Sequence, residues 1–240
     1  LETRTLPSGG SRNLDSTTTG WVRTIDRRQL VASLPAGTRL RLDVAVGDFA
    51  TADLPIGRVW GSGDVTFGAL RGIEVGRTRS LEQDPRFGIQ LLVDIALRAL
   101  SPGINDPTTA VTVVRHLERP LMTVLTGEPR STIVRADRER MVVMPNDPDK
   151  GDYVVMTMRP IVLAARDEPP VLLAVADVLG RLRLGLLDRE LDERVRHLDA
   201  EAEVIRDMAA DLHEWDRDEI RKRLEGLGLA EEADEHSAGG

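Results

Sequence analysis

Hydrophobic positions recur every three or four residues in two segments near the middle of the chain, 84–100 and 106–127. Each segment opens with an aspartate followed by a proline, Asp84-Pro85 and Asp106-Pro107. This pair is typical of a helix start, because aspartate accepts from free N–H groups and proline needs no N–H partner in the first turn. Only residues 101–105 connect the segments. The pattern therefore predicts a helical hairpin.

Short strands are predicted on both sides of this hairpin. Within 21–76, apolar and polar residues alternate most clearly over 40–46, and turn-forming glycines and prolines follow. A β-hairpin is predicted over 131–145. The stretch 153–166 is ambiguous, because its β-branched residues favour a strand, its length favours a helix, and Pro160 weakens both.

The C-terminal part of the chain is predicted to be helical. An apolar helix is expected over 171–187, followed by a seven-residue repeat over 191–212. The repeat places a single apolar stripe on one helix face, as in a coiled-coil seam or in a long helix of a bundle. Because a seam can join two copies, we expect a homo-oligomer. The stripe consists of Leu191, Val195, Leu198, Ala202, Ile205, Ala209 and Leu212.

Composition narrows the class of protein. The 240 residues are 41% hydrophobic and 30% charged, with no cysteine and a net charge of −8, which excludes a disordered chain and a disulfide scaffold. The segment 188–240 holds 18 acidic and 8 basic residues, so the part before it is nearly neutral. The longest apolar runs have about five residues, too few to span a bilayer. An acidic chain does not favour nucleic-acid binding, and we expect no nucleic-acid partner.

Motifs for a metal or a cofactor are not found. Glu193 and His197 lie four residues apart and could contact one metal ion, but a metal site needs three or four ligands, so a solvated pair is the better interpretation. Gly61-Ser62-Gly63 lacks the residues of a phosphate-binding loop. We expect no cofactor and no metal.

The connection of the predicted helical hairpin is the main candidate site. Asp94 and Arg98 lie four residues apart on an otherwise apolar helix, close to the polar connection. One interpretation is an ion pair beside helix-capping side chains. The other is a polar pocket for an anion at the N-terminus of the second helix, with Asp94 as a base or an orienting group. The candidate residues are Asp94, Arg98, Ser101, Asn105, Asp106 and Thr109.

A first resemblance concerns the predicted strands. Gly20-Trp21-Val22, Val44-x-Val46-Gly47-Asp48-Phe49 and Leu54-Pro55-Ile56-Gly57-x-Val59 resemble a biotinyl- or lipoyl-type barrel-sandwich hybrid module. Such modules carry their prosthetic group on a lysine, and residues 21–60 contain no lysine. A carrier role is therefore not expected.

A second resemblance is more specific. Arg77-x-Arg79, Glu82-Gln83-Asp84-Pro85-x-Phe87-Gly88 and the run from Asp94-Ile95-Ala96 through Ser101-Pro102-Gly103-Ile104-Asn105-Asp106-Pro107 to Thr109-Ala110 are similar to the bacterial predicted membrane protein family called domain of unknown function 2254. The resemblance extends over about residues 20–227. It implies the soluble C-terminal domain of a bacterial plasma-membrane protein, with its own transmembrane segment and the lipid bilayer as partners and the cytoplasm as the expected side. It implies no activity. It adds Arg77, Arg79, Glu82, Gln83 and Asp84 to the residues of interest.

Together these patterns predict an α+β fold. We expect a flexible linker at 1–20 after a membrane segment, a small barrel-sandwich-like β module at 21–76, and a mostly helical domain at 77–227. That domain would contain the central helix hairpin, the β-hairpin and a C-terminal helical region, followed by an acidic disordered tail at 228–240. The favoured function is a non-enzymatic assembly or regulatory domain attached to a transmembrane part, for which a channel or a transporter is one interpretation. The alternative is an enzyme or anionic-ligand sensor with its site at Ser101–Asp106.

Overall fold

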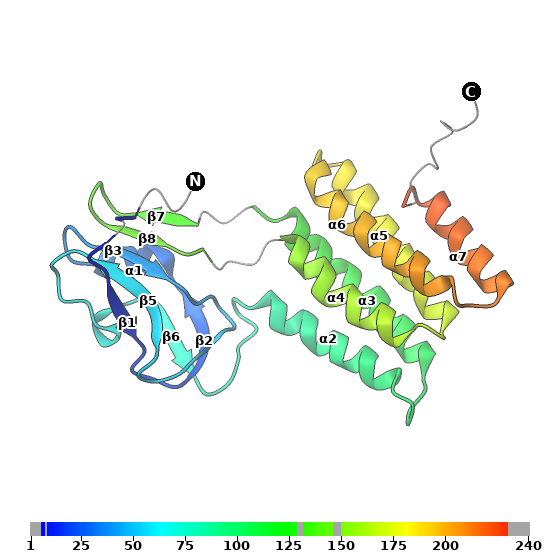
Figure 1. The fold of residues 1–240 in the computed structure, drawn as a ribbon, viewed down its shortest axis with the longest axis horizontal. Helices are drawn as coiled ribbons and strands as arrows, with labels where there is room; N and C mark the ends of the chain where they lie inside the picture. The colour runs from blue at the N-terminus through cyan, green and yellow to red at the C-terminus, as the bar shows by residue number, and fades with distance from the viewer. Residues whose placement is uncertain (1–5, 8, 129–131, 146–149, 230–240) are drawn as a thin grey trace. The chain divides into compact units, whose positions relative to one another are not determined.

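The computed structural model describes residues 6–7, 9–128, 132–145 and 150–229 (Figure 1). The chain forms two compact units. One comprises residues 1–87 and 128–148 and contains the strands, and the other comprises 88–127 and 149–240 and is helical. This arrangement confirms the predicted α+β class.

The strands described in the β unit form two sheets. In the five-stranded sheet the order is β1-β5-β3-β8-β7, and all neighbours are antiparallel except β3 and β8, which are parallel. The second sheet has the order β4-β2-β6. The described strands form open sheets and no closed barrel, and the barrel-sandwich arrangement stays a prediction. The elements are β1 Arg12–Asp15, β2 Gly20–Ile25, α1 Arg27–Ser33, β3 Arg39–Leu42, β4 Phe49–Ala50, β5 Pro55–Trp60, the 3-10 helix η2 Phe67–Ala69, β6 Ile73–Gly76, β7 Ile133–Arg135 and β8 Met141–Val143.

Alternate residues of the five-stranded sheet build the core of this unit. Leu40 and Leu42 of β3 are buried together with Val59 of β5 and Val142 of β8, and Leu30 of α1 packs in the same cluster. The residues between them point to the opposite face of the sheet, because successive side chains of a strand alternate. That face carries Arg39, Arg41 and Arg58 beside the buried Met141 and Val143.

Three strands of this sheet lie outside the predicted β module 21–76. β1 lies in the predicted linker 1–20, where it pairs with β5 and buries Leu14. β7 and β8 form the predicted hairpin, but the hairpin joins β3 rather than the helical region, since Val142 continues the apolar row begun by Leu40. The boundaries expected at residues 20 and 76 therefore differ from those of the compact unit.

The described residues of the helical unit form six helices. The hairpin of α2 and α3 confirms the prediction from the two Asp-Pro pairs. The ambiguous stretch 153–166 falls mostly in helix α4, where burial of Met158, Ile161 and Val162 offsets the backbone hydrogen bond that Pro160 removes. The helices are α2 Pro85–Ala99, α3 Pro107–Thr126, α4 Lys150–Ala164, α5 Pro169–Leu187, α6 Asp192–Ala209 and α7 Glu214–Gly226.

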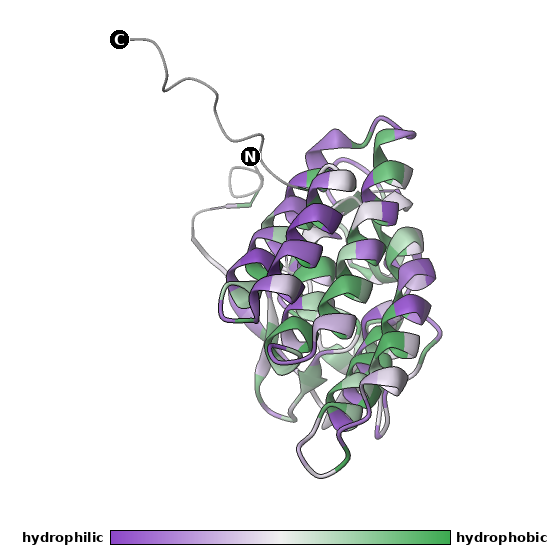
Figure 2. Ribbon diagram, turned by 90° about the vertical axis from the view of Figure 1, so that its right-hand side faces the viewer, coloured by the Kyte–Doolittle hydropathy of each residue, from purple (hydrophilic) through white to green (hydrophobic). Residues whose placement is uncertain are grey.

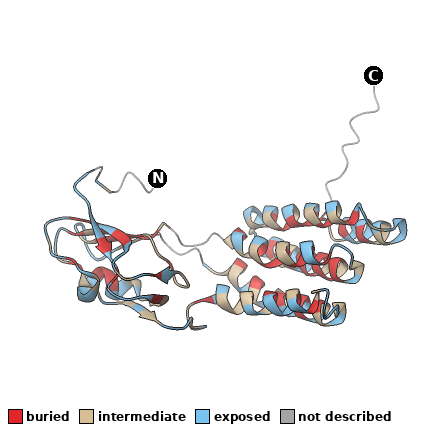
Figure 3. Ribbon diagram, turned by 60° about the horizontal axis from the view of Figure 1, so that its bottom comes forward, coloured by how far each residue is buried: buried red, intermediate tan, exposed pale blue. Residues whose placement is uncertain are grey.

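The apolar stripe of the seven-residue repeat faces the interior of this bundle. Leu198, Ala202 and Ile205 of α6 are fully buried and share one core with α3, α4 and α5. Buried and exposed residues alternate along the helices (Figure 3), as do hydrophobic and hydrophilic ones (Figure 2). The stripe belongs to a bundle helix, so it is not available as a seam between copies. Residues 230–240 of the predicted tail lie outside the described residues.

Candidate functional site

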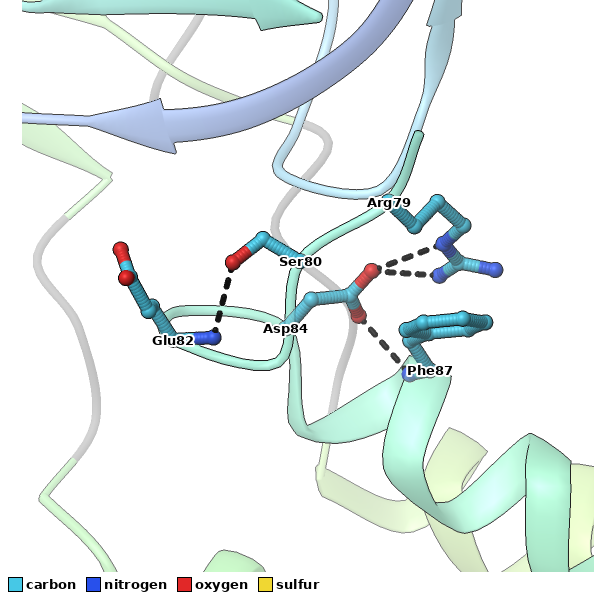
Figure 4. Close-up of polar contacts among 5 residues, drawn as sticks. All are labelled: Arg79, Ser80, Glu82, Asp84 and Phe87. Atoms are coloured by element: carbon cyan, nitrogen blue, oxygen red, sulfur yellow. Dashed lines mark hydrogen bonds and ion pairs between the residues drawn. The ribbon is translucent and has the colours of Figure 1, made fainter. Parts of the chain in front are cut away.

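Arg79 and Asp84 form a largely buried ion pair in the segment before α2. The guanidinium of Arg79 donates to Oδ2 of Asp84 from Nε at 2.9 Å and from Nη2 at 2.6 Å (Figure 4). The other carboxylate oxygen accepts from the backbone N–H of Phe87 at 2.9 Å, as a helix cap does. Asp84 is 2% exposed and Arg79 is 18% exposed. One carboxylate thus neutralises the arginine and caps α2.

Aromatic and backbone groups enclose this pair. The Cζ atom of Arg79 lies 5.2 Å from the ring centroid of Trp21 and 4.8 Å from that of Phe87, within the range of cation–π attraction. Gly47 has a φ of +92°, and a Cβ built on it would lie 2.6 Å from Oδ2 of Asp84. The turn at Gly47 therefore needs glycine for its conformation and for its contact with the pair.

The other residues of this motif differ in their surroundings. Gln83 accepts a hydrogen bond at its Oε1 from the backbone N–H of Ile25 at 3.1 Å, which attaches the segment to β2. The backbone N–H of Glu82 donates to Oγ of Ser80 at 3.3 Å, while its side chain is exposed. Arg77 is exposed. Arg79, Gln83 and Asp84 therefore lie against the β unit, and the side chains of Arg77 and Glu82 face water.

The start of α3 is held by Asp106. Its Oδ1 accepts from the backbone N–H of Thr109 at 3.0 Å, and its Oδ2 accepts from the hydroxyl of Thr109 at 2.5 Å. The hydrogen bond from the Thr109 hydroxyl and, to a smaller extent, that from its backbone N–H hold the pKa of Asp106 below its usual range, because they stabilise the ionised form. Asn105 before it has a φ of +48°, a conformation that asparagine tolerates.

The structure does not place Asp94 and Arg98 around one point. Asp94 is exposed and accepts from Nε2 of Gln90 at 2.8 Å, on the preceding turn of α2. Arg98 is also exposed, and it forms no ion pair with Asp94 or any other residue that the structure describes. The hydroxyl of Ser101 donates to the carbonyl of Arg98 at 2.7 Å. Ser101 and Asp106 thus shape the turn and the helix start, while Asp94 and Arg98 face water.

One buried carboxylate was not found from the sequence. Glu201 of α6 is fully buried and accepts from Nε of Arg159 at 2.9 Å and from Nη2 at 2.6 Å, which ties α6 to α4. Hydrogen bonding to Glu201 raises the pKa of Arg159. The signal was the position of Glu201 beside Ala202, at the edge of the apolar stripe.

Among the described residues, no three or more His, Asp or Glu side chains gather as they would around a metal ion. Glu193 and His197 both lie on α6, and the ring of His197 packs against Gly151 at the start of α4. The carboxylates of the motif have structural partners instead: Asp84 pairs with Arg79 and caps α2, and Asp106 caps α3. They therefore stabilise the starts of these two helices.

The family model described as Predicted membrane protein (DUF2254) matches residues 2–181. The chain belongs to this family. An uncharacterized protein of Mycobacterium tuberculosis strain H37Rv is 34% identical over 200 residues, and one of Mycobacterium bovis is equally similar. Each match covers 78% of this chain and 38% of the relative, so the chain spans well under half of the curated relatives it matches. No solved structure matches the chain significantly.

The matched range contains both motif segments, from Arg77 to Ala110. Within the described residues, no helix combines the length and apolar character that a membrane span needs.

Proposed function

We propose that the chain is an extramembrane part of a bacterial plasma-membrane protein, on the cytoplasmic side, and that it acts as a non-enzymatic assembly or regulatory domain. The observation that carries this proposal is the family match together with the share of the relatives that the chain spans, 38%. The larger part of such a protein would then supply the membrane segments.

The outer faces of the helical unit support an aqueous location. Arg181 of α5 pairs with Glu118 of α3 at 2.7 Å, and both side chains are partly exposed. Arg223 of α7 pairs with Asp177 of α5 at 2.6 Å in the same manner. Ion pairs on outer faces are well solvated in water, whereas placing them against lipid chains costs free energy.

The roles of the motif carboxylates support a non-enzymatic domain. Asp84 is closed off by Arg79 and the N–H of Phe87, and both carboxylate oxygens of Asp106 accept from Thr109. A general base needs free access to its substrate's proton. Asp94 is accessible, but its described partner is Gln90, so the alternative of an enzyme or sensor at 101–106 has less support.

Cysteine labelling in a full-length protein that contains this chain tests the location. The chain has no cysteine, and Asp167 is 82% exposed, so Asp167→Cys supplies one reactive thiol in this region. We expect a membrane-impermeant maleimide to label it only after the cells are permeabilised. The parent protein and the buried Ala202→Cys serve as controls for background and for unfolding. Labelling in intact cells, or recovery of the protein without membranes, would contradict the proposal.

An assembly role also predicts the oligomeric state of the full-length protein. We expect a homo-oligomer in detergent by light scattering, through a surface other than the stripe of α6, because that stripe is buried within one copy. A strictly monomeric particle would remove assembly and leave regulation.

A further inference from the structure

The outer face of the five-stranded sheet carries a group of arginines, Arg39 and Arg41 of β3, Arg58 of β5 and Arg135 of β7, which we call the basic face. The strand registers place them together. Arg41 lies directly opposite Arg58, Arg39 lies opposite Met141 of β8, and Met141 lies opposite Arg135. Paired residues in neighbouring strands point to the same side of a sheet, so all four belong to one face.

The positive charge of this face is only partly balanced. Arg41 pairs with Asp43 at 2.6 Å. Arg58 and Arg135 are exposed and form no ion pair with any residue in the described part of the chain. Arg58 lies directly opposite Arg41, so the single carboxylate of Asp43 faces two like charges, and like charges opposite each other are unfavourable in a sheet.

Trp60 lies on the same face. It lies directly opposite Arg39 and is 9% exposed, and its indole N–H has no hydrogen-bond acceptor among the described residues. A buried donor without an acceptor is unusual and costs free energy. Met141 and Val143 beside it are buried. The apolar part of this face is therefore closed, and its accessible part is cationic.

We propose that the basic face binds the anionic phospholipid headgroups of the membrane to which this protein belongs. The inference rests on the proposed membrane location and names the partner of the β unit. The described part of the β unit has 14 basic and 12 acidic residues, whereas that of the helical unit has 16 basic and 21 acidic residues. Positive charge thus gathers on the unit that carries the basic face. A lipid surface offers a flat array of phosphates to a sheet face, while an acidic helical unit disfavours a long nucleic acid.

Vesicle cosedimentation of the full 240-residue chain tests this partner. The probes are vesicles of phosphatidylglycerol and phosphatidylcholine in equal amounts, and vesicles of phosphatidylcholine alone. We expect binding to the first only, and loss of that binding at about 1 M salt, where the Debye length falls to about 3 Å. Arg58→Gln with Arg135→Gln should weaken binding about 25-fold, since each arginine near an anionic surface contributes about a fivefold factor.

The matched control is Arg115→Gln with Arg119→Gln on α3, which removes two exposed arginines from the helical unit. It should keep the binding of the parent chain. Equal losses in both double variants, or no binding to anionic vesicles, would overturn the proposal. Tighter binding to a single-stranded oligonucleotide or to polyglutamate than to anionic vesicles would also overturn it in favour of another polyanion. If vesicle binding fails while the cysteine of Asp167→Cys is labelled as expected, only this inference falls and the proposed location stands.

Discussion

Arg79 donates two hydrogen bonds to a single carboxylate oxygen of Asp84, at 2.9 and 2.6 Å, and leaves the other oxygen to the N–H of Phe87. The ion pair and the cap of α2 therefore depend on the same side chain. Because Trp21 and Gly47 enclose the pair, the segment that precedes α2 is attached to the β unit at several points.

Asp84→Ala should destabilise the β unit by about 3 kcal/mol. The change leaves the largely buried Arg79 without its counter-charge and removes the cap of α2. Chemical denaturation followed by tryptophan fluorescence measures the loss, since Trp21 lies against Arg79. The control is Asp94→Ala, whose side chain is exposed and should cost less than about 0.5 kcal/mol. Similar losses in the two variants would contradict the coupling of pair and cap.

Gly47→Ala should destabilise the protein by about 2–4 kcal/mol. Its Cβ would collide with Asp84 and Arg79, and its φ of +92° is unfavourable for alanine. Gly37→Ala separates the two effects, because Gly37 has a φ of +70° and open space around its missing Cβ. That control should cost only about 1 kcal/mol in the same denaturation experiment. The contact with the ion pair is unimportant if the two alanine variants unfold together.

Ile205→Ala should lower the free energy of unfolding of the helical unit by about 2–5 kcal/mol, because it opens a cavity at a fully buried position. Circular dichroism at 222 nm measures this change. Val155→Ala on α4, where the side chain is 37% exposed, should cost less than about 1 kcal/mol. A value for Ile205→Ala as small as that of the control would show that the stripe of α6 is not packed inside the bundle.

The lowered pKa of Asp137 predicts how the stability of the protein responds to acid. Hydrogen bonds from the backbone N–H and the side chain of Arg140 lower the pKa of Asp137 from 3.8 to about 2. Because its pKa is lower in the folded chain, its contribution is complete above pH 3.8 and is lost as the pH falls toward 2. Asp137→Asn should make the melting temperature fall less between these two pH values. An equal fall in melting temperature for Asp137→Asn and the parent chain would rule out this role.

The candidate site was only partly predictable. The Asp-Pro pairs identify Asp84 and Asp106 as helix caps because capping depends on neighbours within three residues. Gly47 lies against Asp84, and Trp21 lies against its partner Arg79. Both precede the pair by tens of residues, and no local pattern brings them together. Glu201 is similar, since its partner Arg159 lies on another helix.

The sequence by itself determined the α+β class, the helical hairpin at Asp84 and Asp106, and the apolar face of α6, because helix periods and caps are local properties. Only the tertiary structure decided that β8 pairs in parallel with β3, that 153–166 is mostly helical, and that the stripe of α6 is buried within one copy. These outcomes depend on contacts between residues up to about a hundred positions apart. Burial of apolar surface selects among such contacts, and a local pattern cannot do so.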